Sequence, residues 1–252
     1  MPLTVTVGDD HVAVVEFDNP PHNHFDIALL GAIADAYGQI DADPAARAVV
    51  LCSTGRHFCA GADFGDGEGI AVKSIYSAAY RMFKAQTPVV AAVQGAAVGG
   101  GLGLAMSADF RIATESTRFQ ANFARLGLHH GFGLTVSLPR VVGHQTASEL
   151  LLTGAPVKGQ EALAIGLCDG LASNEPADEL RTKARDFAAE IAAAGPLAVR
   201  SIRNTLRGDL AEQVRAATEH EAEEQTKLFG TNDFKEGVQA TAERRPPRFT
   251  GT

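Results

Sequence analysis

Cysteine is scarce in this chain, and long apolar runs are absent. The 252 residues include three cysteines, Cys52, Cys59 and Cys168, and none of them forms a Cys-x-x-Cys pair. That pattern favours small apolar side chains in a reducing compartment over disulfides or a metal site. No stretch reaches the roughly 18 apolar residues of a membrane span. The first residues resemble neither a signal peptide nor an Arg-rich transit sequence. We therefore expect a cytoplasmic protein without membrane contact or metal.

A surplus of positive charge is also missing. The chain has 22 Lys and Arg against 30 Asp and Glu, a formal net charge of −8, and no dense basic run. Nucleic acid and anionic membranes are therefore not expected as partners. With 45% hydrophobic and 21% charged residues, the composition is that of a globular protein and not of a disordered one. The length suits one large α/β domain, or a main domain with a small appendage.

Hydrophobic periodicity predicts strands that alternate with helices. We expect a hairpin over residues 3–17 and strands over 48–53, 88–93, 110–113 and 168–172. Helices are expected over 26–41, 70–85, from the turn near 99 through 106, and over 146–152, 178–194, 197–206, 209–229 and 232–244. This alternation indicates right-handed crossovers and a mostly parallel sheet.

Gly195 and Pro196 mark the clearest internal boundary. A glycine commonly follows the end of one helix, and a proline commonly opens the next. This pair divides the chain into a core over residues 1–195 and a helical region over residues 196–252.

Two glycine-rich turns carry the strongest functional signal. Each follows a predicted buried strand: GRHFCAGADF begins at Gly55, and VQGAAVGGGLGLAM begins at Val93. Small residues let the backbone approach a ligand closely, and the free N–H groups of a helix start attract negative charge. Two such turns can aim two N–H donors at one oxygen, which is the arrangement of an oxyanion hole. Tight packing of helix on strand is the alternative.

Other glycine-rich motifs fit poorly. Leu104 and Met106 stand where a dinucleotide fingerprint needs Gly or Ala, and no Gly-Lys-Ser/Thr of a phosphate loop or Gly-x-Ser-x-Gly of a hydrolase occurs. The segment from Asp63 to Glu68 resembles a calcium loop only faintly, because Gly65 and Gly67 stand at ligand positions.

The same two segments, HFCAGADF and VQGAAVGGGLGLAMSADFRIA, closely resemble the enoyl-CoA hydratase/isomerase (crotonase) family. The likeness continues through LPRVVG, ELLLTGAPVKGQEALAIGL and FGTNDFKEGVQATAERRPPRF, and it covers nearly the whole chain in order. It implies a crotonase-like α/β spiral of ββα units. The region 196–252 would then be a helical segment that builds homotrimers, or hexamers as dimers of trimers. The implied substrate is an acyl-CoA thioester, with coenzyme A part of the substrate and no separate cofactor.

The resemblance also assigns roles to individual residues. Ala62 and Gly100 match the two backbone N–H donors that hold the thioester oxygen. Contacts to the coenzyme are implied for His22, Asn23, His24, Arg56, Ala60 and Asp63. Solvent exposure is an alternative for the histidines and Arg56. Asp63 is interpreted mainly as closing its own loop by a hydrogen bond.

The two glutamates of the family's hydratases are missing. Gly103 and Phe123 stand at their positions, and neither side chain can transfer a proton. Other members carry an aspartate near His130 or Gly131, so His129 and His130 are candidates for acid–base catalysis, with His130 slightly favoured. A structural role for both imidazoles is the alternative. The sequence therefore leaves three functions open: enolate chemistry without the glutamate pair, a non-catalytic CoA-ester-binding protein, and a thioester hydrolase.

Overall fold

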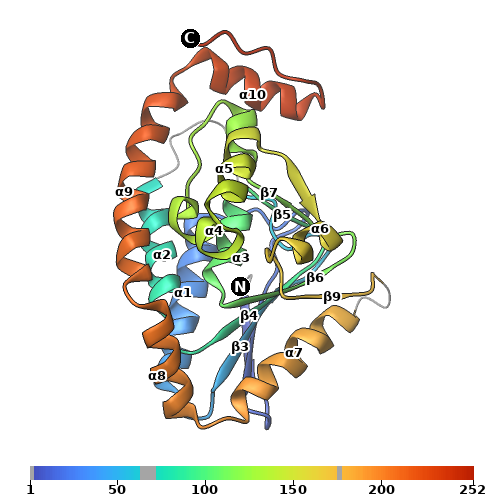
Figure 1. The fold of residues 1–252 in the computed structure, drawn as a ribbon, viewed down its shortest axis with the longest axis vertical. Helices are drawn as coiled ribbons and strands as arrows, with labels where there is room; N and C mark the ends of the chain where they lie inside the picture. Colours follow the sequence, from blue (N-terminus) through green and yellow to red (C-terminus); the bar gives the residue numbers. More distant parts are fainter. Residues whose placement is uncertain (1–2, 63–71, 175–177) are drawn as a thin grey trace.

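A six-stranded sheet runs through the centre of the molecule (Figure 1). The computed structural model describes residues 3–62, 72–174 and 178–252. In spatial order the strands are β1 (Leu3–Val7), β2 (Val12–Phe17), β3 (Ala48–Ser53), β4 (Val89–Val93), β6 (Phe110–Thr114) and β9 (Gly170–Ala172). The β1–β2 pair is the predicted antiparallel hairpin, and the other pairs are parallel. The predicted α/β class with a mostly parallel sheet is confirmed.

Helices cover both faces of this sheet. One face carries α1 (Ile27–Ala42), α2 (Val72–Lys84) and α3 (Gly100–Ser107), and the opposite face carries α7 (Asp178–Ala192). Every residue of β3 is buried, because alternate side chains enter two different cores. Val49 and Leu51 enter the larger core, and Val50 packs with Ala184 of α7. Burial on both faces explains why the strand is apolar throughout rather than alternating.

The structure also contains a three-stranded sheet that the sequence analysis did not predict. It consists of β5 (Ala96–Val98), β7 (Arg118–Gln120) and β8 (Pro156–Lys158). Between and around these strands lie the 3₁₀ turn η1 (Asn122–Leu126), α4 (Leu134–Val142), α5 (His144–Thr153) and α6 (Gly159–Ala164). Strands of three residues are too short to show a periodicity of two.

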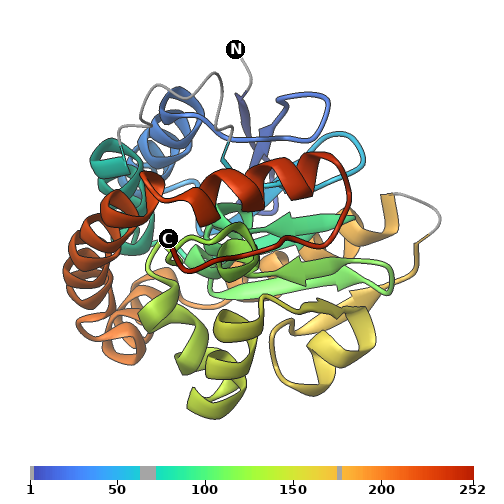
Figure 2. The same ribbon diagram turned by 90° about the horizontal axis from the view of Figure 1, so that it is seen from above.

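Two of the three C-terminal helices, the first and the second, run along one side of the molecule, and the third crosses one end of it (Figures 1 and 2). They are α8 (Pro196–Arg207), α9 (Leu210–Phe229) and α10 (Asn232–Ala242), and α9 lies beside α2 (Figures 1 and 2). The apolar stripe of α9 and α10 suggests burial against neighbouring subunits, but most of it packs on its own chain instead. Val214 is fully buried there, and Leu228, Phe229 and Phe234 pack against the main core.

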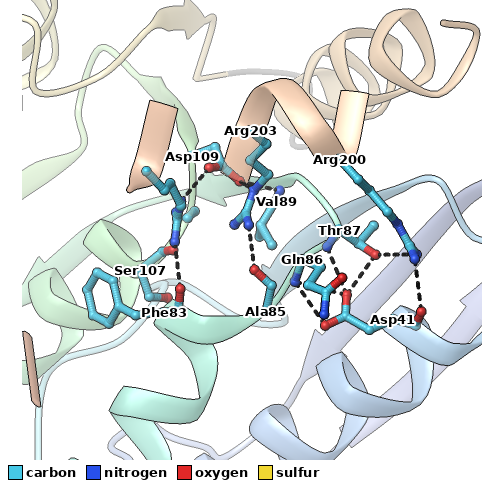
Figure 3. A network of polar contacts seen from close by, with 12 residues as sticks. Asp41, Phe83, Ala85, Gln86, Thr87, Val89, Ser107, Asp109, Arg200 and Arg203 are labelled. Carbon is cyan, nitrogen blue, oxygen red and sulfur yellow. Dashed lines mark hydrogen bonds and ion pairs between the residues drawn. The ribbon is translucent and has the colours of Figure 1, made fainter. Parts of the chain in front are cut away.

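The helix α8 presents its polar side to the rest of the chain. The carboxylate of Asp109 accepts hydrogen bonds from Arg203 Nε (2.9 Å) and Arg207 Nε (2.8 Å), and Arg200 donates to Thr87 and to the carbonyl of Asp41 (Figure 3). The outward side is apolar, since Leu197, Ile202 and Leu206 are exposed. In the described ranges, no helix combines the length and apolar character that a membrane crossing requires.

Candidate functional site

The two glycine-rich turns lie side by side. Cys59 N–H donates to the Ala96 carbonyl (3.0 Å), and Val98 N–H donates to the Cys59 carbonyl (3.0 Å), so the first turn runs parallel to β5. Gly61 follows with φ of +104°, a conformation that favours glycine. A Cβ at Gly61 would lie 2.9 Å from the Val98 carbonyl oxygen and 3.9 Å from Gly100 N. The absence of a side chain at Gly61 thus lets the turns touch.

Both predicted donor N–H groups are free of backbone partners in the described part of the chain. Gly100 is the first residue of α3, where an N–H has no acceptor within the helix. Ala62 forms a parallel bridge with Phe25, whose N–H donates to the Gly61 carbonyl at 3.0 Å. In a parallel bridge one of the two residues bonds to the neighbours of the other; here that residue is Phe25, so the N–H of Ala62 points away from Phe25. Ala62 and Gly100 line the same cavity.

The wall of this cavity is mostly apolar. Besides the turns themselves, its apolar lining residues include Phe25, Val72, Ile75, Val98, Phe123, Leu126, Leu128, Phe132 and Phe229. Its polar side chains are Tyr76, Asn122 and Gln225. Within the described ranges no carboxylate, imidazole or ammonium group lines it. Asp63, for which a coenzyme contact was predicted, lies outside the described residues.

The structure leaves no room for acidic side chains at two of the positions discussed above. A Cβ at Gly103 would lie 2.4 Å from Phe132 Cβ, and a Cβ at Gly131 would lie 2.0 Å from the Tyr76 hydroxyl. Phe123 is buried and lines the cavity. Aromatic side chains thus fill the space around the paired turns.

The two candidate histidines lie outside the cavity lining. Their rings stack on each other with centroids 4.2 Å apart. His129 Nδ1 lies 2.7 Å from the His130 carbonyl oxygen, and His130 Nε2 lies 2.8 Å from the Thr135 hydroxyl. The catalytic role of either imidazole stays a prediction.

Burial decides how His130 titrates. Desolvation, reinforced by the neighbouring His129 and His220, lowers the pKa of His130 to about 4. A pKa this far below neutrality would leave the imidazole uncharged at neutral pH and only weakly able to accept a proton.

A buried carboxylate lies behind the histidines. Glu221 of α9 is fully buried and accepts hydrogen bonds from Gly133 N–H (2.8 Å), Thr135 N–H (3.2 Å) and the Thr135 hydroxyl (2.7 Å). Burial raises the pKa of this carboxyl group. Because these donors lie at the N-terminus of α4, Glu221 caps that helix from another element.

The predicted coenzyme contacts divide into two kinds. Asn23 is 3% exposed; its amide donates to the carbonyls of Thr54 and His57 and accepts from Asn19 N–H. Both N–H groups of its side chain are thus used within the protein, where Asn23 joins two turns.

The remaining coenzyme candidates gather on the surface. His22 and Arg56 are exposed, His24 is half-buried, and the His22 ring lies 5.5 Å from that of His57. Ala60 N–H donates to the His22 carbonyl at 3.2 Å, and Ala60 also lines the cavity. The basic groups therefore stand next to the first of the paired turns.

Sequence reasoning missed the polar residues of the cavity. Tyr76 comes from α2, Asn122 from η1 and Gln225 from α9. One weak signal existed: Glu221, Gln225 and Phe229 recur every four residues, which places them on one face of a helix.

Comparison with known proteins gives a consistent result. Residues 8–252 match the sequence model of the family described as Enoyl-CoA hydratase/isomerase. A probable enoyl-CoA hydratase of Bacillus subtilis is 33% identical over 251 residues, with 96% of each chain covered. A crotonyl-CoA hydratase of Syntrophomonas wolfei is 32% identical, with 96% of this chain and 95% of the relative covered. The crystal structure of carnitinyl-CoA hydratase from Mycobacterium avium superposes with a TM-score of 0.89 at 30% identity and covers 100% of this chain and 99% of its own. The chain therefore belongs to the enoyl-CoA hydratase/isomerase family and has the crotonase fold.

Proposed function

We propose that this acyl-CoA enzyme binds the thioester oxygen between the N–H groups of Ala62 and Gly100 and stabilises an enolate there. The observation that carries the proposal is the contact between the two turns, which brings both residues to one apolar cavity. When a proton leaves the carbon next to the thioester, negative charge moves onto the oxygen. Two N–H donors and the N-terminus of α3 then stabilise that charge, with roughly 3–4 kcal/mol for each donor.

The coenzyme would lie across the basic groups beside this turn. Arg56 offers positive charge for its phosphates, His22 and His24 offer ring N–H donors, and Ala60 lies between them and the cavity. The apolar wall would receive the acyl chain. The face of α8 with Leu197, Ile202 and Leu206 would pair with further copies in a trimer or hexamer.

The described cavity holds no carboxylate or imidazole, and this favours enolate chemistry without the usual pair of acids. The same observation favours a second candidate, a protein that binds CoA esters without turning them over. A thioester hydrolase is a third outcome that assays can recognise, because it releases the free thiol of coenzyme A.

Exchange of α-protons separates these functions. Butyryl-CoA is incubated with the protein in D₂O, and mass spectrometry follows deuterium in the acyl group while a thiol reagent follows free coenzyme A. An enolate-forming enzyme incorporates deuterium, a hydrolase releases thiol, and a binding protein does neither. A panel of other acyl-CoA esters then defines the substrate range.

The variant Gly100→Pro removes one proposed donor. We expect exchange to fall by about 10²–10³-fold. A Cβ at Gly100 also meets the Phe25 ring, so Gly100→Ala, which adds the carbon but keeps the N–H, is the matched control. Equal losses in both variants would refute the oxyanion role of this N–H.

A further inference from the structure

Two of the three polar side chains among the described residues of the cavity, Tyr76 and Gln225, form hydrogen bonds within the protein, and the third, Asn122, does not. Tyr76 O–H donates to Gln225 Oε1 at 2.7 Å, and Gln225 Nε2 donates to the His129 carbonyl at 2.9 Å. Because a carbonyl can only accept, the second bond fixes the orientation of the Gln225 amide. The phenol must then be the donor of the first bond.

These two side chains are also covered on their remaining sides. Gln225 Nε2 and the Tyr76 hydroxyl both pack against the backbone of Gly131, at 2.8 and 2.0 Å from where a Cβ would be. Burial raises the pKa of Tyr76, so the phenol stays protonated. The O–H of Tyr76 and one N–H of Gln225 are therefore already used within the protein.

Asn122 differs from both. Its side-chain amide lines the cavity and is half-buried, and it has no hydrogen-bond partner among the described residues. An amide left unpaired in an apolar wall is unfavourable unless a ligand or water binds it. Among the described lining residues, Asn122 is thus the polar side chain that makes no hydrogen bond within the protein.

The position of Asn122 shows which part of a ligand it reaches. Its Oδ1 atom lies 3.0 Å from where a Cβ on Gly99 would be, and Gly99 directly precedes Gly100. On the proposed function, Gly100 N–H holds the thioester oxygen. Asn122 therefore lies beside the acyl carbons nearest the thioester rather than at the far end of the chain.

We propose that Asn122 is a specificity-determining residue that binds a hydroxyl oxygen next to the thioester. An amide donates and accepts, which matches the one donor and the lone pairs of an O–H group. The hydroxyl belongs either to a hydroxyacyl thioester or to a water molecule that adds to an unsaturated one. An amide transfers no proton, so its contribution is binding and orientation. This inference rests on the proposed function.

Asn122→Leu tests it, because leucine has a similar size and no polar atom. Calorimetry measures the affinity of the wild type and the variant for 3-hydroxybutyryl-CoA and butyryl-CoA. If the acyl hydroxyl binds Asn122, the wild type prefers the hydroxy ester by about three- to tenfold, and the variant loses this preference. Asn204→Leu, on the exposed side of α8, should keep it.

If Asn122 binds a water molecule instead of an acyl hydroxyl, the rate of crotonyl-CoA hydration reveals it. In that case the wild type does not distinguish the two esters, but Asn122→Leu slows hydration of crotonyl-CoA at least tenfold with unchanged crotonyl-CoA affinity. A variant that keeps both the wild-type preference and the wild-type hydration rate overturns the inference. Asn122→Ala provides the same comparison if the leucine variant does not fold. If the wild type binds neither ester, the proposed function fails, and this inference fails with it.

Discussion

At the scale of single residues, aromatic side chains fill the space around the positions where the family resemblance predicts acid–base groups. Phe132 adopts a φ of +63° and places its Cβ against Gly103. A left-handed conformation of a bulky residue costs about 1–2 kcal/mol and persists only where its surroundings hold it. Gly103 and Phe132 are therefore coupled, and neither can change alone without strain.

This coupling predicts that a glutamate cannot simply be restored. Gly103→Glu should lower the free energy of unfolding by about 1–3 kcal/mol or more, because inserting extra atoms into a packed core typically costs that much. It should leave crotonyl-CoA hydration near the wild-type rate. Gly103→Glu combined with Phe132→Gly removes the clash, so in urea unfolding the double variant should lose less stability than the sum of the losses of the two single variants. Full stability of Gly103→Glu alone would contradict the packing described here.

His130 gives a pH-dependent prediction. Its pKa falls from about 6.5 in the unfolded chain to about 4 in the fold, so the unfolded chain binds the proton more readily. Above pH 6.5 the neutral imidazole makes its full contribution to the free energy of unfolding. As the pH falls towards 4, this contribution of about 3 kcal/mol is lost. His130→Asn should flatten this loss in urea unfolding at pH 7.5 and 4.5, whereas His144→Asn, on the exposed side of α5, should not. The same acid sensitivity in wild type and His130→Asn would rule out this origin.

The catalytic hypothesis for the same residue has a separate test. Because its ring faces Thr135 and not the cavity, we expect His130→Ala to slow α-proton exchange less than tenfold. Loss of a true proton carrier typically costs about 10²-fold or more. A hundredfold loss with unchanged acyl-CoA affinity would reinstate His130 as the acid or base. The expected limb of the rate profile would then lie near pH 4.

At the scale of elements, α9 serves as a wall of the site. It contributes Gln225 and Phe229 to the cavity and caps α4 through Glu221. Its role therefore goes beyond the oligomerisation expected of the region 196–252. The turn before α4 carries Phe132, so the cap also supports the side chain that packs on Gly100 and Gly103.

Removal of the cap should loosen this arrangement. Glu221→Ala leaves the donors of Gly133 and Thr135 without their acceptor, and we expect a loss of about 3 kcal/mol in the free energy of unfolding. Glu219→Ala, on the exposed side of the same helix, should cost less than about 0.5 kcal/mol. Equal small losses would show that the cap contributes little.

Element by element, the sequence predicts much of this fold and less of the site. The strands of the large sheet and helices α7 to α10 follow from periodicity and from the Gly195–Pro196 pair. Helix α4 was missed because Pro139 lies inside it and residues in the left-handed region precede it. The paired turns were predictable because glycines mark them. The free amide of Asn122 was not, because it depends on which groups other elements leave unpaired.

At the scale of the whole molecule, α8 turns an apolar side outward. Leu197 is 83% exposed and Leu206 is 75% exposed, while the arginines of the same helix face the protein. Such a face is costly in water, and identical copies meeting around a symmetry axis can cover it.

Assembly is therefore predicted to depend on α8. Sedimentation velocity at micromolar concentration should show a trimer or hexamer. Ile202→Glu with Leu206→Glu should shift it towards smaller species, because charges would enter the contact. Val5→Glu, an exposed position on β1, is the control. A wild type that sediments as a monomer would refute this assembly.

The route of the chain around the cavity has a consequence for its biosynthesis. Phe25 precedes α1, and Phe229 is the last residue of α9, yet both line one cavity. A nascent chain emerges N-terminal end first, so it can form both glycine turns while the cavity still lacks a side. A ligand stabilises only the state that binds it. Acyl-CoA can therefore stabilise the finished subunit. It contributes little stability to a ribosome-bound intermediate in which α9 has not yet been synthesised.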